Sequence, residues 1–451
     1  MHRRTFLEAG GSAAFGLALG GCASRVRPET VLAPRRRLVS LVPVEASWDR
    51  IIRTTVGLRP HRDSGFVLKA ERFDEKTVIH NYGHGGAGMS LSWGTGVLAA
   101  DLAMAHTERR AAVIGCGIVG LTSARQLQRR GFDVTIYAAS LPPNTTSNMS
   151  WAAFTPTSGL VSNDRRTPEW DEQFRRAVEI SYKEHQLLSG SRYGVSWLNE
   201  YSPTDNSSGG RGGAGGGRGG GGAGGGGGGG GGGSAGGAGG AGGAGGDAGR
   251  GGGVGAGASG AASAPSPPPL LPSSVRTGAV VLGPGEHPFA TAYAVQRPTM
   301  RFEPSIYLDA LMRDVLAFGG RIVVRTFDTP RDLMSLGESL IVNCSGLGAK
   351  ALFGDEELVP DKGQLAVLIP QAEVNYSVAG MMPRSDGIVL GHVSQRGVWS
   401  LDVDEDRRKR VVDTAIAFFS RMRAPSPLAQ QASSDAPAVV PPVESFFGRE
   451  S

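Results

Sequence analysis

The feature that most constrains the fold is a glycine turn that joins an apolar run to a helical segment. In "AAVIGCGIVGLTSARQL", Gly115, Gly117 and Gly120 have the spacing GxGxxG, and a second apolar run, "DVTIYA", follows the helical segment. The first glycine permits a tight turn, the second lets the backbone approach a pyrophosphate, and the third lets the helix pack closely on the strand. The helix start, at Ile118 and Val119, presents unpaired N–H groups to an anion. The sequence therefore predicts a parallel α/β domain that binds a dinucleotide.

The end of the second apolar run departs from the usual dinucleotide pattern. An acidic residue is expected there for the adenosine ribose, but the chain reads Tyr137, Ala138, Ala139 and Ser140. The missing carboxylate weakens the case for NAD, and no arginine at this place marks NADP. Ser140 or a backbone group would have to bind the ribose.

A second glycine loop precedes the first one in the chain. The segment "VIHNYGHGGAGMSLSWGTG", residues 78–96, contains a strand-like start, a glycine cluster and the start of a helix that continues through "VLAADLAMA". Like the first loop, it has the pattern of a loop that holds a phosphate or a cofactor. We interpret His80 and His84 as turn and packing residues rather than as catalytic bases.

Composition excludes several classes of protein. The chain has 451 residues, of which 40% are hydrophobic, and this is enough for one large or two ordinary domains with a real core. The formal charge of +5 comes mainly from scattered arginine, and no basic stripe interleaves with aromatic residues, so nucleic acid is not an expected partner. The three cysteines have neither metal-ligand spacing nor a disulfide pattern, so no metal is expected.

The N-terminal segment has the features of an export signal. Arg3 and Arg4 precede a mildly apolar run that is too short to span a bilayer and that ends at Gly21 and Cys22. This pattern looks like a twin-arginine signal with a lipoprotein cleavage box, which implies removal of residues 1–21 and a lipid on Cys22. The expected location is then the periplasm or the cell-envelope face, with attachment to a membrane surface. Ordinary cleavage without a lipid is the alternative.

The remaining chain divides into ordered segments and a long insertion. About half of the 71 glycines lie in one tract without apolar periodicity, which cannot bury enough surface to order itself. We predict a signal at 1–22, a linker at 23–36, an ordered segment at 37–106, a dinucleotide-binding segment with the start of a second domain at 107–208, a disordered Gly-rich and then Pro-rich insertion at 209–275, a second ordered segment at 276–423 and a disordered tail at 424–451.

Several motifs together resemble the D-amino-acid oxidase family of flavoproteins. The loop at 78–96 is similar to the family's carboxyl-terminal flavin-binding signature, "VGLRPHR" to its substrate-arginine segment, and "LIVNCSGLGAKALF", "DKGQ" and "GIVLGHVSQRGVWS" to its central segments. The resemblance covers most of the predicted ordered chain and implies FAD as the cofactor. It implies an α/β fold with a Rossmann-like FAD-binding domain of the glutathione-reductase type. An α+β substrate domain with a mainly antiparallel sheet would complete it.

The order of these motifs is not that of the family. In the family the flavin-binding signature comes last, whereas here it precedes the dinucleotide loop. We therefore expect a circular permutation, in which the helix after the signature leads through the short linker "HTERR" into the first strand of the FAD domain. Residues 37–106 would then form a permuted flavin-ring and substrate-arginine segment. Both glycine loops would serve one FAD, with residues 115–120 at the pyrophosphate and residues 85–90 at the flavin ring.

The resemblance implies oxidative deamination of a D-amino acid, with hydride transfer from its α-carbon to flavin N5 and with molecular oxygen as electron acceptor. The products would be a 2-oxo acid, ammonia and hydrogen peroxide. Arg59 would hold the substrate carboxylate with its planar guanidinium, and Arg62 is the fallback. Tyr376 would contact the same carboxylate, although a second tyrosine of the family falls on Gly380. The carbonyl group of Gly86 would accept the substrate amine.

The cofactor contacts that the resemblance implies fall in three segments. Donors at the start of the helix after the flavin signature would face flavin O2 and stabilise the reduced anion. The residues are Gly85, Gly88, Met89 and Ser90 at the ring, Gly115, Gly117, Ile118, Val119 and Gly120 at the pyrophosphate, and Thr145, Thr146 and Ser147 between them, in "PPNTTSNMSWAAFTP".

Three alternatives stay open from the sequence. The first is a related glycine or amine oxidase, and the second is a D-amino-acid dehydrogenase that passes electrons to a membrane quinone. The third is an exported flavin-binding lipoprotein without turnover. A carboxylate clamp at Arg59 would separate amino-acid substrates from plain amines. The side-chain preference of the substrate and the formation of a homo-oligomer stay open.

Overall fold

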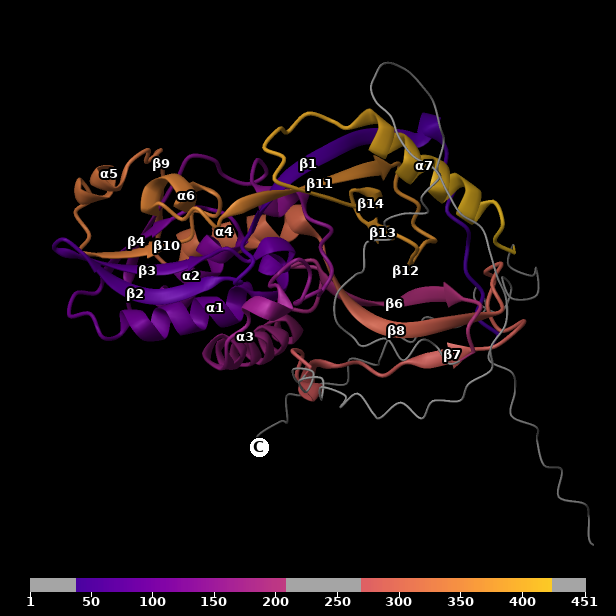
Figure 1. Cartoon of the computed structure of the whole chain (residues 1–451), viewed down its shortest axis with the longest axis horizontal. Helices are drawn as coiled ribbons and strands as arrows, with labels where there is room; N and C mark the ends of the chain where they lie inside the picture. The colour runs from indigo at the N-terminus through magenta and orange to yellow at the C-terminus, as the bar shows by residue number, and fades with distance from the viewer. Residues whose placement is uncertain (1–37, 208–268, 424–451) are drawn as a thin grey trace, which may run out of the picture. The chain divides into compact units, whose positions relative to one another are not determined.

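The computed structural model describes residues 38–207 and 269–423 (Figure 1). The predicted signal at 1–22 with its lipid-attachment residue Cys22, the linker at 23–36, nearly all of the Gly-rich tract and the tail at 424–451 lie outside the described residues. Among the described residues, no helix is long and apolar enough to cross a membrane.

The regular elements alternate between strands and helices along most of the chain. The strands are β1 Ile51–His61, β2 Val67–Phe73, β3 Lys76–Tyr82, β4 Arg110–Ile114, β5 Asp133–Ala138, β6 Val195–Thr204, β7 Val280–Leu282, β8 Tyr293–Phe302, β9 Arg321–Val324, β10 Leu340–Asn343, β11 Val359–Leu368, β12 Tyr376–Val378, β13 Met381–Arg384 and β14 Gly387–Arg396. The helices are α1 Gly88–Ala103, α2 Ile118–Arg129, α3 Pro168–Leu187, α4 Pro304–Ala317, α5 Pro330–Met334, α6 Gly348–Phe353 and α7 Glu405–Phe419.

One sheet of the described chain has six strands in the order β2-β3-β10-β4-β5-β9. All neighbours in it pair in parallel except β2 and β3. Successive residues of β4 enter different core clusters: Ala111 and Val113 face α1 and α2, whereas Ala112 and Ile114 face the side of α5. A strand buried on both faces is typical of a parallel sheet covered by helices on each side. The predicted parallel α/β domain is confirmed.

Helix α1 owes its position to two glycines. A Cβ atom on Gly94 would lie 1.9 Å from the carbonyl oxygen of Ala177 in α3, and one on Gly96 would lie 3.2 Å from the backbone nitrogen of Ser123 in α2. The Gly94 N–H also donates to Ser181 Oγ at 2.7 Å. The absence of side chains at these places lets α1 pack closely between α2 and α3, beneath the six-stranded sheet in the view of Figure 1.

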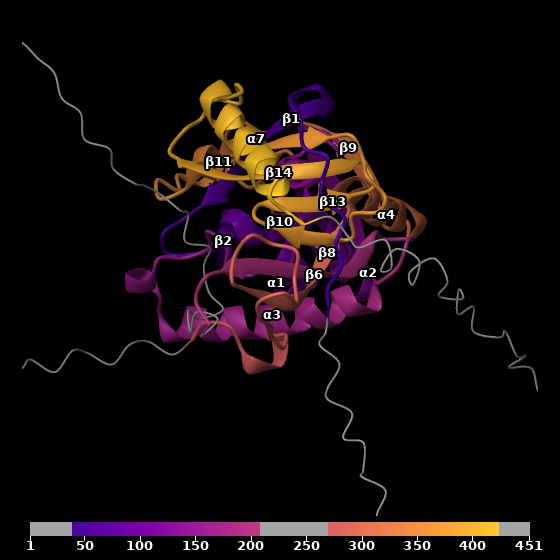
Figure 2. The ribbon, with the colours of Figure 1, turned by 90° about the vertical axis from the view of Figure 1, so that its right-hand side faces the viewer.

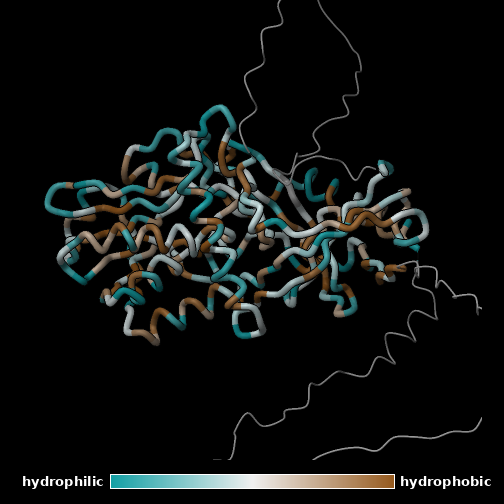
Figure 3. The backbone as a smooth tube through the Cα atoms, turned by 90° about the horizontal axis from the view of Figure 1, so that it is seen from below, coloured by the Kyte–Doolittle hydropathy of each residue, from teal (hydrophilic) through white to brown (hydrophobic). Residues whose placement is uncertain are grey.

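The second sheet of the described chain has eight strands in the order β1-β11-β14-β13-β12-β6-β8-β7. Its neighbours pair antiparallel except for β12 and β6, so the expected mainly antiparallel sheet is confirmed. Helix α7 covers one face, where Val412 and Phe419 share a core cluster with Leu390 (Figure 2). On the opposite face, Val367 packs against Ala153. Figure 3 shows hydrophobic residues along the inner strands and helices and hydrophilic residues in many outer loops.

The structure corrects the predicted end of the insertion at residue 275. Residues 269–275 belong to the folded part, and Ser273–Val275 form a short 3-10 helix. Val275 is buried, and Leu270 and Leu271 pack against the main core cluster. These apolar side chains after the proline run supply enough buried surface to order the chain before Arg276.

Candidate active site

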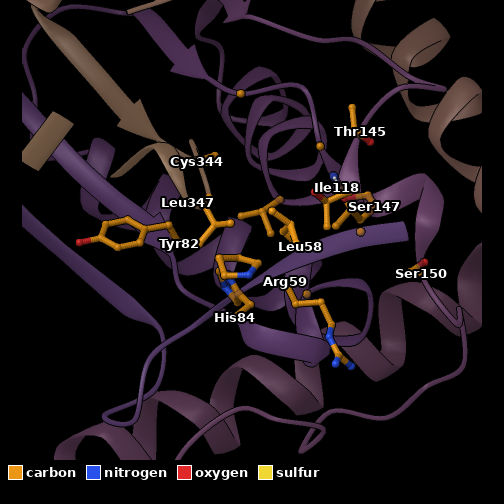
Figure 4. Close-up of a pocket in the computed structure, with 18 of the residues that line it drawn as sticks. Leu58, Arg59, Tyr82, His84, Ile118, Thr145, Ser147, Ser150, Cys344 and Leu347 are labelled. Atoms are coloured by element: carbon orange, nitrogen blue, oxygen red, sulfur yellow. Dashed lines mark hydrogen bonds between the residues drawn. The ribbon is translucent and has the colours of Figure 1, made fainter. Parts of the chain in front are cut away.

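A cavity of about 540 Å³ lies where the two sheets meet (Figure 4). Its walls come from the carboxyl ends of five parallel strands, which is where open α/β sheets bind ligands. The antiparallel sheet closes the cavity from the other side. The lining residues fall within 81–89 after β3, 114–119 after β4, 137–140 after β5, 325–327 after β9, 344–352 after β10, 57–60 of β1, 363–365 of β11 and the loop 144–158.

The dinucleotide loop, residues 115–120, has the geometry that its glycines predict. Gly115 has a φ of +109°, and a Cβ atom there would lie 2.5 Å from the Cys344 carbonyl oxygen. A Cβ on Gly120 would lie 2.0 Å from the Gly115 carbonyl oxygen, so Gly120 allows the helix to pack but does not itself line the cavity. Gly117 does line it, and a Cβ there would meet Ser147 Oγ at 3.1 Å. The backbone at Gly117 is therefore open for a phosphate to approach.

Helix α2 begins at this loop and directs its N-terminus into the cavity. The residue before the helix, Gly117, supplies no side-chain cap. The Ile118 N–H donates to Ser147 Oγ at 3.0 Å. Ile118 and Val119 line the cavity, as do Thr145, Thr146 and Ser147. The two predicted segments around the pyrophosphate therefore come together at one wall.

The flavin-ring loop, residues 85–90, lies at another wall. Cβ atoms on Gly85 and Gly86 would lie 2.0 Å from the Gly159 carbonyl oxygen and 2.8 Å from that of Ser158, so a distant loop packs directly on them. Helix α1 starts here without a side-chain cap and without an acidic residue in its first turn. Gly85, Gly86, Gly88 and Met89 line the cavity. Two helix N-termini thus point into one cavity and favour negative charge at both places.

Ser90 has a different place from the one predicted. It does not line the cavity, because its hydroxyl oxygen accepts the Thr155 N–H at 2.8 Å. The side chain fixes the segment that carries Ala153 and Thr155 onto α1. This corrects the expectation that Ser90 donates to flavin O2.

Arg59 projects from β1 into the cavity wall (Figure 4). Its Nε donates to the Asp361 carbonyl oxygen at 3.1 Å, and its Nη2 lies 2.8 Å from Asp361 Oδ2. This second contact is electrostatic rather than a directed hydrogen bond, because the Nη2 hydrogens have no acceptor in line. Nη2 is buried against Asp361, whereas Nη1 makes no hydrogen bond or ion pair among the described residues and is therefore the donor left for a ligand. The fallback residue Arg62 is less suited to bind a ligand, since its guanidinium pairs with Asp355 and Glu357.

The structure places Tyr376 away from the cavity, which corrects its predicted role. The side chain is 1% exposed in β12, and its hydroxyl donates to the Val42 carbonyl oxygen at 2.8 Å. The same hydroxyl lies 3.8 Å from Met422 Sδ. Tyr376 therefore connects two ends of the described chain. Gly380, where the family has a second tyrosine, has a φ of +75° in the turn between β12 and β13.

His80 and His84 are packing residues, as predicted. His80 is buried, with Nε2 2.9 Å from Glu71 Oε1, and it accepts from the Asn343 amide at 3.1 Å. His84 stacks on Phe66 with a ring separation of 5.3 Å. Burial lowers the pKa of His84 to about 3, so the ring is neutral at physiological pH.

The sequence did not indicate two groups of residues at the site. Arg325, Thr326 and Phe327 line the cavity beside Tyr137 and Ser140, where the ribose carboxylate is missing. They arrive from the end of β9, which pairs in parallel with β5, and no local pattern indicates this pairing. Asp361, the partner of Arg59, stands 302 positions away in the sequence. Among the described residues, no cluster of His, Cys, Asp or Glu could hold a metal ion.

The donors that line the cavity fit FAD. The α2 end offers a bare glycine backbone, an uncapped helix N-terminus and three hydroxyl side chains to a pyrophosphate. The α1 end offers a second uncapped N-terminus to an electron-rich ring edge. The residues that would hold the cofactor are Gly115, Gly117, Ile118, Val119, Thr145, Thr146 and Ser147 at the phosphates and Gly85, Gly88 and Met89 at the ring.

Comparison with known proteins gives the same assignment. A family model described as "FAD dependent oxidoreductase" matches residues 3–102 and 110–200. The D-amino-acid oxidase of Streptomyces coelicolor is 40% identical over 93 residues, which are 19% of this chain and 29% of that protein. Human D-aspartate oxidase is 30% identical over 127 residues, which are 27% of this chain and 36% of that protein.

A longer match extends over most of the chain. The D-amino-acid oxidase of Rubrobacter xylanophilus is 25% identical over 323 residues, which are 70% of this chain and 78% of that protein. The two shorter matches span only about a third of their relatives' length, 29% and 36%. The chain thus contains an FAD-dependent oxidoreductase domain, with FAD as its cofactor.

Proposed function

We propose that the protein oxidises D-amino acids to 2-oxo acids, with release of ammonia and hydrogen peroxide. The observation that carries this proposal is the arrangement of Arg59 in the same cavity as the two uncapped helix N-termini. FAD bound there would supply the acceptor for the α-hydrogen as hydride and would pass the electrons to oxygen. The names of the matched relatives, two D-amino-acid oxidases and a D-aspartate oxidase, support this choice.

Arg59 would bind the substrate carboxylate. Its side chain is 25% exposed, and Nη1 makes no hydrogen bond or ion pair within the part of the chain that the structure describes. A planar guanidinium can hold a carboxylate through two parallel hydrogen bonds, which fixes the direction of the α-carbon. Asp361 holds the guanidinium in place from behind. Its carbonyl oxygen accepts from Arg59 Nε, and its carboxylate lies beside Nη2. Arg59 thus combines a fixed position with a free donor at Nη1.

The flavin-ring loop would position the other end of the substrate. We assign the Gly86 carbonyl oxygen as the acceptor of the substrate amine, because Gly86 lines the cavity together with Arg59. The segment Ser158 to Gly159 packs on Gly85 and Gly86 and so restricts the access of water to this wall. The N-terminus of α1 would stabilise the negative charge that develops on the reduced cofactor.

The test is anaerobic bleaching of the purified yellow protein with a panel of D- and L-amino acids. Arg59→Ala should lower kcat/KM by about 30-fold or more, since a lost contact to a buried carboxylate costs roughly 2–5 kcal/mol, at about 1.4 kcal/mol per tenfold. Arg59→Lys should recover only part of the rate, because a point charge cannot hold the carboxylate at two places. FAD content, read from the visible spectrum, should be retained in the lysine variant, which also keeps a cation beside Asp361.

The outcomes of this test separate the alternatives. Unchanged rates in both Arg59 variants would contradict the carboxylate clamp and favour an amine without a carboxylate. Reduction by glycine alone would favour a glycine oxidase. Slow reoxidation by oxygen with fast reoxidation by a quinone analogue would favour a dehydrogenase. No bleaching by any amino acid would favour a flavin-binding protein without turnover.

We also propose that the chain is a circular permutation of the family's fold. Helix α1 ends at Ala103 and β4 begins at Arg110, and the family model matches in two pieces that part in this same interval. Both ends of the described chain attach to one segment: the Val39 N–H donates to the Glu286 carbonyl oxygen and the Arg423 N–H to that of Pro288, each at 2.9 Å. Ends that lie this close can be joined without a change of fold.

A rearranged chain tests the permutation. It would begin at residue 110, run to residue 423, and continue through a short Gly/Ser linker into residues 38–109. If the permutation is real, this chain should bind FAD and unfold at a temperature close to that of the original order. Loss of FAD binding in a folded rearranged chain would contradict it.

We propose further that the protein is exported and lipid-anchored at Cys22. The support is the pair Arg3 and Arg4 and the apolar run that ends at Cys22, all outside the described residues. Mass spectrometry of the membrane-associated protein from its native host should find an N-terminal, lipid-modified Cys22. An unmodified N-terminus at Met1 would contradict this proposal.

A further inference from the structure

A second, smaller cavity of about 160 Å³ lies on the other side of a segment that lines the main cavity. Ala153 and Thr155 of this segment line the main cavity. Phe154 and Pro156, which alternate with them along the chain, line the second one. The Thr155 N–H donates to Ser90 Oγ at the start of α1, which holds the segment in place. The second cavity is therefore a space separate from the site already described.

Three aromatic rings form much of the apolar wall of this second cavity. The ring centroids of Phe154 and Tyr182 of α3 lie 5.3 Å apart, and Tyr182 meets Trp197 of β6 edge-on at 6.2 Å. Trp197 is 42% exposed, which is much for a ring that is highly buried on average. An apolar cavity of about 150 Å³ is large enough to hold benzene, so this one can hold an aromatic or a branched aliphatic side chain. The other apolar lining residues are Leu271, Val275, Pro298 and Met300.

Two opposite charges on neighbouring strands line the same cavity. Glu200 of β6 and Arg297 of β8 are cross-strand partners in the register of the two strands. Within residues 38–207 and 269–423, neither side chain makes a hydrogen bond or an ion pair, and they interact only through the attraction of their charges. A third charged residue at this cavity, Arg276, donates from Nε and Nη2 to the Leu271 carbonyl oxygen at 3.1 and 2.6 Å. One carboxylate and one guanidinium are therefore left for a ligand.

Glu200 lies in a hollow rather than on an open surface. The residue is exposed to solvent, yet desolvation raises the pKa of its carboxyl group above the ordinary value, and the charge of Arg297 offsets this only in part. A carboxylate that water reaches but cannot fully surround shows this combination. An ammonium group beside Glu200 would stabilise its charged form again.

We propose that the second cavity binds a zwitterionic amino acid with an aromatic or a branched aliphatic side chain. Arg297 would hold the carboxylate, Glu200 would hold the ammonium group, and the rings of Tyr182 and Trp197 would pack on the side chain. Such a ligand gives both charges a partner, whereas an amine or a carboxylic acid gives a partner to one of them. No acidic side chain is among the described residues that line the main cavity, so the two cavities recognise an ammonium group by different means.

Equilibrium dialysis of L-phenylalanine against the holoenzyme under anaerobic conditions tests the site. Two analogues each lack one charge: 2-phenylethylamine has no carboxylate, and 3-phenylpropionate has no ammonium group. Each analogue should bind about fivefold or more weakly than L-phenylalanine, because one charge of the cavity loses its partner. Glu200→Gln and Arg297→Gln should each weaken L-phenylalanine by about fivefold or more and leave the FAD content, read from the visible spectrum, unchanged.

Two further variants separate the second cavity from its surroundings. Glu373→Gln is the matched control, because Glu373 is exposed and lines neither cavity, and it should leave the affinity unchanged. Arg59→Lys alters the main cavity alone, so binding of L-phenylalanine should persist in it, with the same order of the three compounds. This order keeps the proposal testable even where Glu200→Gln or Arg297→Gln does not fold. Absence of saturable binding, equal affinity for the three compounds, or an affinity that falls in Arg59→Lys but not in an FAD-containing Glu200→Gln variant would each overturn the proposal.

Discussion

The two glycine loops in the cavity need their glycines for different reasons. In the dinucleotide loop, a Cβ on Gly120 would collide with Gly115 of the same loop, 2.0 Å away. In the flavin-ring loop, a Cβ on Gly85 would collide with Gly159, which belongs to a remote segment, also at 2.0 Å. A loop that packs on its own backbone is determined by its local sequence. A loop that packs on a remote segment depends on the whole fold, and its neighbour can move.

The largest expected effect is that of Gly120→Ala. The new Cβ would meet backbone atoms that the strand and the helix hold in place, so we expect a loss of about 4 kcal/mol or more in the free energy of unfolding. Urea unfolding measures it. Gly117→Ala is the control, since its Cβ would meet a single side-chain hydroxyl, and it should fold but bind FAD more weakly. Equal stability of Gly120→Ala and wild type would remove the distinction between the two loops.

Acid should affect the flavin-ring side of the cavity. Burial lowers the pKa of both His84 and His185 from 6.5 to about 3, and His185 lies in the core beside α1. Because the unfolded state binds these protons first, stability is complete above pH 6.5 and falls as the pH drops toward 3. Each histidine contributes roughly 1.4 kcal/mol per pH unit, so the two remove about 4 kcal/mol by about pH 5. Urea unfolding at neutral pH and at about pH 5 tests this, and equal midpoints would contradict it.

Gly85→Ala should have a smaller effect than Gly120→Ala. Alanine would have to adopt a φ of +52° and displace Gly159, but the segment at 159 is a loop that can shift. We expect a loss of roughly 1–3 kcal/mol in stability. FAD should remain bound, with a higher KM for the substrate because the loop that carries Gly86 has moved. A loss of stability as large as that of Gly120→Ala would show that both loops are equally rigid.

Tyr376→Phe should have the smallest effect and belongs to neither loop. The variant loses the hydrogen bond to the Val42 carbonyl oxygen, which is worth about 1 kcal/mol. Because Tyr376 does not line the cavity, KM and kcat for D-alanine should not change. An increase in KM would show that the tyrosine reaches the substrate after all.

The same contrast explains how much the sequence could predict. The strand, turn and helix around Gly115 to Gly120 follow from local pattern, and the structure confirms them together with both sheet types. Ser90 and Tyr376 were assigned by resemblance alone, and hydrogen bonds to Thr155 and Val42 place them elsewhere. The pair of Arg59 and Asp361 depends on the register of two strands that are far apart in the chain, which no local pattern encodes.

The position of β10 has a consequence for the order in which the molecule can assemble. Both glycine loops precede residue 121, yet β3 and β4, which carry them, do not pair with each other, because β10 lies between them. His80 and Asn343, whose hydrogen bond joins β3 to β10, are 263 positions apart. A growing chain therefore displays both loops early but cannot bring them together until residue 343 has been made. The complete cofactor site thus depends on a strand far along the sequence, and we expect the site to form late in folding.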